Sequence, residues 1–200
     1  MTNYVYLASQ SPRRRQLLEQ LGLRYELLLP DADEDAEALE AVVKNEAPAN
    51  YVKRVTALKL DAAVARMKRR KLPVAPVLCS DTTVAMNRTI YGKPEDAKDA
   101  GRMLAELSGK THRVLTAIAV QSGTKRLEAL SISRVSFDVL NAAQMRSYIA
   151  TGEPMGKAGA YAIQGQVAQH ICHISGSYSG IMGLPLRETA LLLRSAGIKI

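Results

Sequence analysis

Aromatic residues are scarce in this sequence, which contains no tryptophan, one phenylalanine and eight tyrosines among 200 residues. A core of ordinary size must therefore be built mainly from aliphatic side chains, as it is in α/β proteins. The scarcity also argues against a surface that binds nucleic acid by stacking bases on aromatic rings. Hydrophobic residues make up 47% of the chain, which argues against wholesale disorder.

Long apolar runs are absent too, since no stretch approaches the roughly 18 consecutive apolar residues of a membrane helix. Residues 1–9 have no basic segment ahead of their short apolar run, so a signal peptide is not expected. The chain has only two cysteines, Cys79 and Cys172, each within an apolar run, and both are predicted to be reduced and buried. These features predict a cytoplasmic protein that does not bind membranes.

Basic residues outnumber acidic ones by 27 to 19, which gives a formal net charge of +8. Such an excess attracts phosphate-bearing ligands, but it does not distinguish nucleotides from nucleic acids. The densest basic run, 68–71, falls where a helix should end, and the helix dipole favours cations there. Net charge therefore indicates a class of ligand and no particular site.

The hydrophobic pattern predicts one α/β unit with a mixed sheet. Alternating or β-branched runs predict strands over 4–8, 25–29, 77–80, 114–120, 127–139 and 167–174, and a hairpin over 83–91. Helical spacing with start and stop residues predicts helices over 12–21, 48–70, 95–107, 141–149 and 185–196. A glycine-rich stretch covers 152–165.

The strand, turn and helix start around residues 9–15 form the strongest local signal. Ser11 suits an N-cap and Pro12 the first helical position. A helix N-terminus offers free N–H groups and partial positive charge to an anion, and Ser9, Arg13 and Arg14 lie at the same turn. The segment predicts a phosphate cradle, with a capped helix bearing solvated arginines as the alternative.

Asp81 follows the apolar strand 77–80, and ligands of α/β sheets bind at strand ends. A buried carboxylate there must be paired or must bind a metal, unless Asp81 only caps a turn. The acidic stretch 31–40 supplies Asp31, Asp33 and Glu34 as further oxygen ligands for a hard cation.

Three more polar side chains are candidates for the same site. Lys59 lies four residues after Val55, so it borders the apolar stripe of its helix. Lys93 precedes a proline, which restricts its backbone. Gln164, in the glycine-rich stretch, can donate and accept hydrogen bonds as a reader of nucleobase edges must.

Taken together, these motifs resemble those of the Maf family of nucleotide pyrophosphatases, in the family's order and over nearly the whole chain. They are LASQSPRR at 7–14, SDTTV at 80–84, GKP at 92–94, LSG at 107–109 with His112 and Thr116, KAGAY and IQG at 157–165, and GLPL at 183–186. The resemblance implies an elongated mixed sheet flanked by helices and two lobes with a cleft between them. It also implies homodimers and a single domain over 1–200.

The resemblance further implies hydrolysis of a nucleoside triphosphate to the monophosphate and pyrophosphate with Mg²⁺ or Mn²⁺. Asp81 matches the family's general base and a metal ligand, Lys59 and Lys93 its phosphate-facing lysines, and Glu34 its acidic metal partner. Asp33 is the alternative to Glu34, because the charged stretch leaves the match open by one residue.

Substrate choice in the family is associated with the positions of Arg13, Thr82 and Gln164, and Ser9, Ser11 and Arg14 complete the predicted substrate-binding set. The motifs SPRR, SDT and IQG are similar to those of the branch that acts on dTTP and UTP, with modified pyrimidine nucleotides as further candidates. The alternatives are the sister branch that prefers 7-methyl-GTP, whose motifs are SPWR, SDQ and SEG, and a non-catalytic nucleic-acid-binding or cell-division regulator. The motifs favour a nucleoside triphosphate over nucleic acid as the partner.

Overall fold

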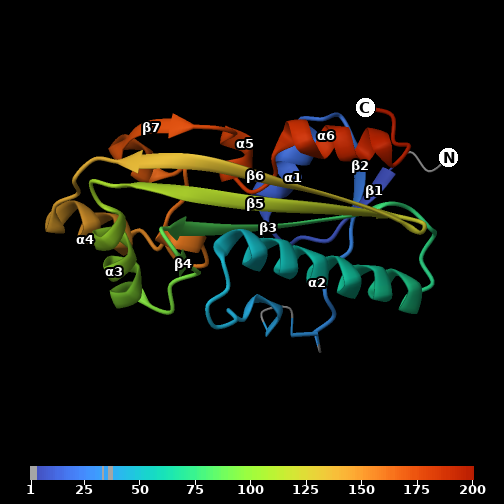
Figure 1. The fold of residues 1–200 in the computed structure, drawn as a ribbon, viewed down its shortest axis with the longest axis horizontal. Coiled ribbons are helices and arrows are strands. Elements are labelled where there is room, and N and C mark those ends of the chain that lie inside the picture. The colour runs from blue at the N-terminus through green and yellow to red at the C-terminus, as the bar shows by residue number, and fades with distance from the viewer. Residues whose placement is uncertain (1–3, 33, 36–37) are drawn as a thin grey trace.

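The computed structural model describes residues 4–32, 34–35 and 38–200, and these form one seven-stranded mixed sheet. Its order is β2-β1-β3-β5-β6-β7, with β4 paired to β3 (Figure 1). The strands are β1 (Tyr4–Leu7), β2 (Arg24–Leu27), β3 (Val77–Met86), β4 (Thr89–Tyr91), β5 (Thr111–Ser122), β6 (Lys125–Phe137) and β7 (Ile171–Ser175). β1 is parallel to β2 and β3, whereas the remaining pairs are antiparallel. The predicted mixed sheet flanked by helices is confirmed.

Helices cover both faces of this sheet (Figure 1). They are α1 (Pro12–Glu19), α2 (Pro48–Arg69), α3 (Ala97–Leu107), α4 (Ala142–Ala150), α5 (Tyr178–Ile181) and α6 (Leu186–Ser195). Ala119 of β5 packs in one cluster with α2, and its neighbour Ile118 packs in another with α1 and α6. Because neighbouring residues of a strand point to opposite faces, α2 lies across the sheet from α1 and α6. None of the described helices is long and apolar enough to cross a bilayer.

Local sequence signals account for several helix ends. Pro48 occupies the first turn of α2, and Arg66, Lys68 and Arg69 lie in its last turn, where the helix dipole favours cations. Asn141 caps α4 in a reciprocal capping box with Gln144. The predicted helices over 48–70 and 141–149 are confirmed to within one residue at each end.

The structure corrects the prediction that a strand ends before Asp81. β3 is one ten-residue strand, and Asp81 lies in its middle. The strand continues because β5 pairs with it from Val77 to Ala85. On the other edge, β1 pairs only as far as Leu78, and β4 pairs only with residues from Val84 to Met86. Among the described residues no strand covers that edge of β3 over 79–83, so the sheet has a gap beside Asp81.

Near the C-terminus the structure agrees only in part with the expectations. The predicted strand over 167–174 is confirmed over its second half by β7, which follows a 3₁₀ turn over Gln166–His170, and the four-residue helix α5 was not predicted. Cys79 is buried as expected, but Cys172 is exposed because it lies on β7, which contacts the sheet only through β6.

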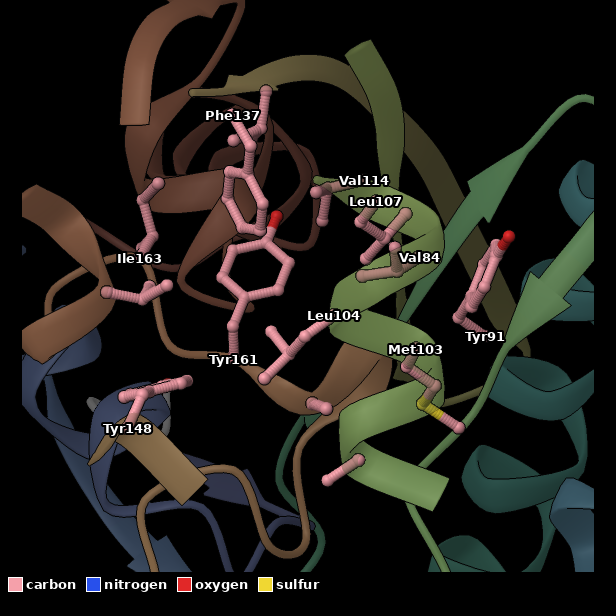
Figure 2. Packing of buried hydrophobic residues seen from close by; sticks show 14 of the residues in the cluster. Val84, Tyr91, Met103, Leu104, Leu107, Val114, Phe137, Tyr148, Tyr161 and Ile163 are labelled. Carbon is pink, nitrogen blue, oxygen red and sulfur yellow. The ribbon is translucent and has the colours of Figure 1, made fainter. Parts of the chain in front are cut away.

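The largest apolar cluster packs α3 and α4 against one end of the sheet (Figure 2). Figure 2 shows the rings of Phe137 and Tyr161 side by side, with centroids 5.0 Å apart. His112 packs edge-on against both rings, and its Nε2 lies 2.7 Å from the Tyr161 hydroxyl. Its other ring nitrogen, Nδ1, has no hydrogen-bond partner in the described part of the chain.

Burial of this histidine predicts loss of stability in acid. Burial lowers the pKa of His112 from 6.5 to about 4. Between these pH values the unfolded chain therefore binds a proton at His112 that the folded chain does not bind. The stability is complete above pH 6.5 and is lost as the pH falls towards 4. At about 1.4 kcal/mol per pKa unit, His112 should remove about 3 kcal/mol from the free energy of unfolding over that range.

Urea denaturation at several pH values checks this prediction against a His112→Gln variant, which has no titrating ring. We expect the wild-type curve to fall more steeply than that of the variant between pH 6.5 and 4. If the free energy of unfolding fell equally with pH in both proteins, His112 would not be the group that causes the loss of stability.

Candidate active site

A cavity of about 620 Å³ opens at the gap in the sheet beside β3. Its walls come from the N-terminus of α1, the middle of β3, one face of α2 between Tyr51 and Arg66, and the segment 156–164. Most of the predicted site residues therefore meet there: Ser9, Ser11, Arg13, Arg14, Glu34, Lys59, Asp81, Thr82, Lys93 and Gln164. Asp33 lies outside the described residues.

Lys59 joins two carboxylates at the floor of this cavity. Its Nζ donates to Oδ1 of Asp81 at 2.6 Å and to Oε1 of Glu40 at 2.7 Å. Lys93 extends the network, because its Nζ lies 3.1 Å from Oε2 of Glu40. The hydroxyl of Tyr51 fixes the backbone of Glu40 by donating to its carbonyl oxygen at 2.9 Å. Four charges thus lie side by side, from α2 (Lys59), β3 (Asp81), the 3₁₀ turn Ala38–Glu40 and the segment after β4 (Lys93).

The carboxylate of Asp81 is nearly buried, with 10% of its side chain exposed. Burial raises its pKa, against the opposite effect of the positive charges of Lys59 and Arg14. For Glu40, burial also acts to raise the pKa, but Lys59 and Lys93 together outweigh it and the pKa is lowered. No hydrogen bond from a described residue reaches Oδ2 of Asp81, so this oxygen can accept a proton from a molecule in the cavity.

The turn before α1 supplies hydroxyls and N–H groups, as predicted. Ser11 is the N-cap residue, but its side chain makes no capping hydrogen bond within the described residues. Its own N–H donates to Oγ of Ser9 at 3.2 Å. The guanidinium of Arg13 lines the cavity and forms no hydrogen bond or ion pair with any described side chain.

Arg14, in contrast, donates hydrogen bonds to three other residues of the protein. Its Nε donates to the carbonyl oxygen of Gly183 at 2.8 Å, and its two terminal nitrogens donate to Ser9 Oγ at 3.2 Å and Thr82 Oγ1 at 3.4 Å. Gly183 has a φ of +113°, and a Cβ there would lie 3.4 Å from Arg14 Nε, so the turn fits closely around the arginine. Arg14 therefore joins α1, β3 and the turn after α5.

The hydroxyl of Thr82 is likewise occupied inside the protein. Thr116 donates its hydroxyl proton to the carbonyl oxygen of Gly180 at 2.7 Å, so Thr82 is the donor in the 2.9 Å contact between the two hydroxyls. Thr82 Oγ1 also accepts a hydrogen bond from Arg14. Thr82 thus shapes the cavity wall more than it offers a free hydroxyl.

Glu34 lies at the edge of the cavity and faces the basic end of α2. Its carboxylate accepts hydrogen bonds from the buried Arg66 and, at 2.5 Å, from Arg69. The hydrogen bonds from Arg66 and then Arg69, against the effect of burial, lower the pKa of Glu34 to about 2. Arg69 and Arg70 also bind Asp31, so part of the basic run 68–71 holds the acidic loop against α2.

The opposite wall comes from the glycine-rich segment. Gln164 lines the cavity with an exposed side chain, beside the buried Tyr161 and Ile163. Lys157 also points to the cavity, and its Nζ donates to the carbonyl oxygen of Glu153 at 2.5 Å.

Glu40 and Lys157 are charged cavity residues that were missing from the predicted site. Glu40 ends a 3₁₀ turn, Ala38–Glu40, in a stretch with no periodic pattern that could have indicated its direction. Lys157 belongs to a recognised motif, but nothing in its spacing distinguished it from the structural glycines around it. The signal for Glu40 was only the acidic composition of the stretch.

The carboxylates present suit a weakly held hard cation. No group of three or more His, Cys, Asp or Glu side chains is arranged to hold a metal among the described residues. Mg²⁺ and Mn²⁺ need only one or two protein carboxylates when phosphate oxygens and water complete the shell. Asp81 and Glu40, both bonded to Lys59, meet that requirement.

Comparison with known proteins identifies relatives along the whole chain. The family model described as Maf-like protein matches residues 4–196. A dTTP/UTP pyrophosphatase of Polaromonas sp. is 70% identical over 99% of this chain and 98% of its own length. A dTTP/UTP pyrophosphatase of Albidiferax ferrireducens is 67% identical over the full length of both. The Staphylococcus aureus Ham1 protein structure covers 96% of each chain, with a TM-score of 0.45 at 11% identity.

Adjacent arginines should differ sharply in their effect on stability. Arg14→Met removes the donors to Gly183, Ser9 and Thr82, and buried acceptors left without a donor are costly. We expect the free energy of unfolding to fall by about 2 kcal/mol, measured by urea denaturation. The matched control is Arg13→Met, which breaks no such bond and should cost less than about 1 kcal/mol. Equal losses in the two variants would contradict the structural role of Arg14.

Proposed function

The chain belongs to the Maf family, and from this premise we propose that it hydrolyses dTTP and UTP to the monophosphate and pyrophosphate. The observation that carries the proposal is the Asp81–Lys59–Glu40 arrangement in a cavity that also holds Arg13 and Lys93. The names of relatives up to 70% identical over nearly the full length support the substrates. The 7-methyl-GTP and nucleic-acid-binding alternatives have no comparable support.

Asp81 acts in this proposal as the general base. A free aspartate with a pKa of ~3.9 is a poor base towards water at ~15.7. Burial raises the pKa of Asp81 and so narrows that gap from the side of the base. Its Oδ2 can take the proton of an attacking water, while Lys59 holds the other oxygen, Oδ1, and fixes the direction of the carboxylate.

Positive side chains offset the charge of the triphosphate, which otherwise repels a nucleophile. Lys59 and Lys93 lie on the Asp81 side of the cavity, and Arg13 lies at the N-terminus of α1. Charges placed in advance in a partly enclosed site stabilise the negative charge that develops on the leaving pyrophosphate. The N–H groups of the turn before α1 add to this cradle.

We propose that Asp81 and Glu40 hold the divalent metal, because Lys59 brings these two carboxylates together in the cavity, whereas Glu34 is held at the basic end of α2 by Arg66 and Arg69. When bound there, Mg²⁺ or Mn²⁺ supplies positive charge that acidifies water and neutralises phosphate oxygens. Lys59 keeps the two carboxylates side by side, and Tyr51 holds the backbone of Glu40. The metal role of Glu34 stays a prediction from the family resemblance.

We propose that Gln164 selects the base, because its side-chain amide can donate a hydrogen bond to the edge of a pyrimidine and accept one from it. Its exposed side chain on the cavity wall is compatible with that role. Thr82 contributes the shape of the wall. A homodimer, a cytoplasmic location and a single domain over 1–200 also stay predictions, and the continuous sheet supports the last of them.

Replacement of the general base should abolish turnover without unfolding the protein. Asp81→Asn keeps the shape of the side chain, and Lys59 retains its ion pair with Glu40. We expect pyrophosphate release from dTTP and UTP to fall on the order of 10³-fold, with a circular dichroism spectrum like that of the wild type. Near-normal release by Asp81→Asn would rule out its role as the base.

Two acidic variants distinguish the proposed metal partner from the residue predicted by resemblance. Glu40→Gln should lower turnover and raise the Mg²⁺ concentration needed for half-maximal rate, with little effect on folding. Glu34→Gln should leave Arg66 without its carboxylate and reduce the free energy of unfolding by about 3 kcal/mol, while the folded protein stays active. A stable but inactive Glu34→Gln protein would return the metal role to Glu34.

Removal of the proposed base reader should alter substrate choice. We expect Gln164→Ala to lower kcat/KM for UTP and dTTP relative to GTP by about tenfold or more. Initial rates on the three nucleotides measure this ratio. If the ranking were unchanged, another residue must read the base.

A further inference from the structure

Two cations in the cavity, Arg13 and Lys157, have no carboxylate partner in the described part of the chain. Lys157 donates to one neutral acceptor, the carbonyl oxygen of Glu153. The carboxylate of Glu153 is itself engaged by the Tyr148 hydroxyl at 2.8 Å and the Gln166 N–H at 3.1 Å. Neither cation therefore forms an ion pair with a carboxylate among the described residues.

The two cations are also close enough to affect each other. Burial, and after it the positive charge of Arg13, lower the pKa of Lys157. Burial lowers the pKa of Arg13 as well. Holding two like charges near each other in a partly enclosed cavity is unfavourable unless an anion binds to them.

Ion-paired and unpaired cations occupy different parts of the cavity. Lys59 and Lys93 form ion pairs with Asp81 and Glu40. Arg13 and Lys157 form no ion pair with a described residue, and Lys157 is attracted by the charge of Glu153 only without direct contact. The Asp81 side of the cavity therefore holds paired charges, with the buried Arg14 as one further cation, and suits the attacked phosphate with its base and metal. The other side has excess positive charge and suits the part of the substrate with the most negative charge.

We propose that Lys157 and Arg13 form a subsite for the terminal phosphates of the triphosphate, which leave as pyrophosphate. This subsite rests on the proposed function for the identity of the substrate, and it places Lys157 and Arg13 at the β- and γ-phosphates of that substrate. Lys157 comes from the segment 156–164 and Arg13 from α1, so bound pyrophosphate would bridge two walls of the cavity. Nucleoside monophosphate, which lacks these phosphates, would not depend on Lys157.

Calorimetric titration with inorganic pyrophosphate and with UMP tests this subsite without requiring turnover. The test variant is Lys157→Met, and the matched control is Lys68→Met, which removes the same charge from the exposed end of α2 outside the cavity. Lys157→Met should weaken pyrophosphate binding at least about tenfold and leave UMP binding unchanged. Lys68→Met should change neither by more than about twofold.

Lys157→Arg guards against a general loss of folding, because it keeps the charge and should restore most of the pyrophosphate affinity. Unchanged pyrophosphate binding by Lys157→Met would overturn the proposal, and so would an equal loss for UMP, which would place Lys157 at the nucleoside. If the wild type bound pyrophosphate through Lys157 but hydrolysed no nucleotide, the proposed function would fail and the subsite would stand. If it hydrolysed UTP and Lys157 had no effect on pyrophosphate, only the subsite would fail.

Discussion

The contact of one lysine with two carboxylates determines how the cavity can work. Lys59 donates to Asp81 at 2.6 Å and to Glu40 at 2.7 Å, so it allows two negative charges to lie together beside a site for a polyanion. Without that ammonium group, two partly buried carboxylates would repel each other and any phosphate nearby. The arrangement requires α2 to run along β3, because Lys59 and Asp81 come from these two elements.

The gap in the sheet gives the substrate access to this network. β5 pairs along almost all of β3, whereas among the described strands the other edge of β3 is left open between the residues that pair with β1 and those that pair with β4. Asp81 is therefore held in a rigid strand and still faces a cavity. Arg14 closes the back of the gap by joining α1 to Thr82 and Gly183, which leaves Arg13 facing the cavity.

Local patterns were sufficient for long elements and insufficient for long-range geometry. The proline and basic residues at the ends of α2, and the capping box of α4, follow from near neighbours in sequence, and both helices were predicted. The continuation of β3 through Asp81 depends on pairing with β5, more than thirty residues away, and was missed. Lys59 was suspected from its place at the border of an apolar stripe, but Glu40 lies in a 3₁₀ turn without periodicity and only the folded chain shows its contacts.

Product identity tests the central claim, cleavage between the α- and β-phosphates, most directly. Phosphorus NMR of a reaction of the purified protein with UTP and Mg²⁺ separates the two modes of hydrolysis. The account predicts UMP and pyrophosphate in equal amounts from the first time point. Accumulation of UDP and inorganic phosphate would contradict it.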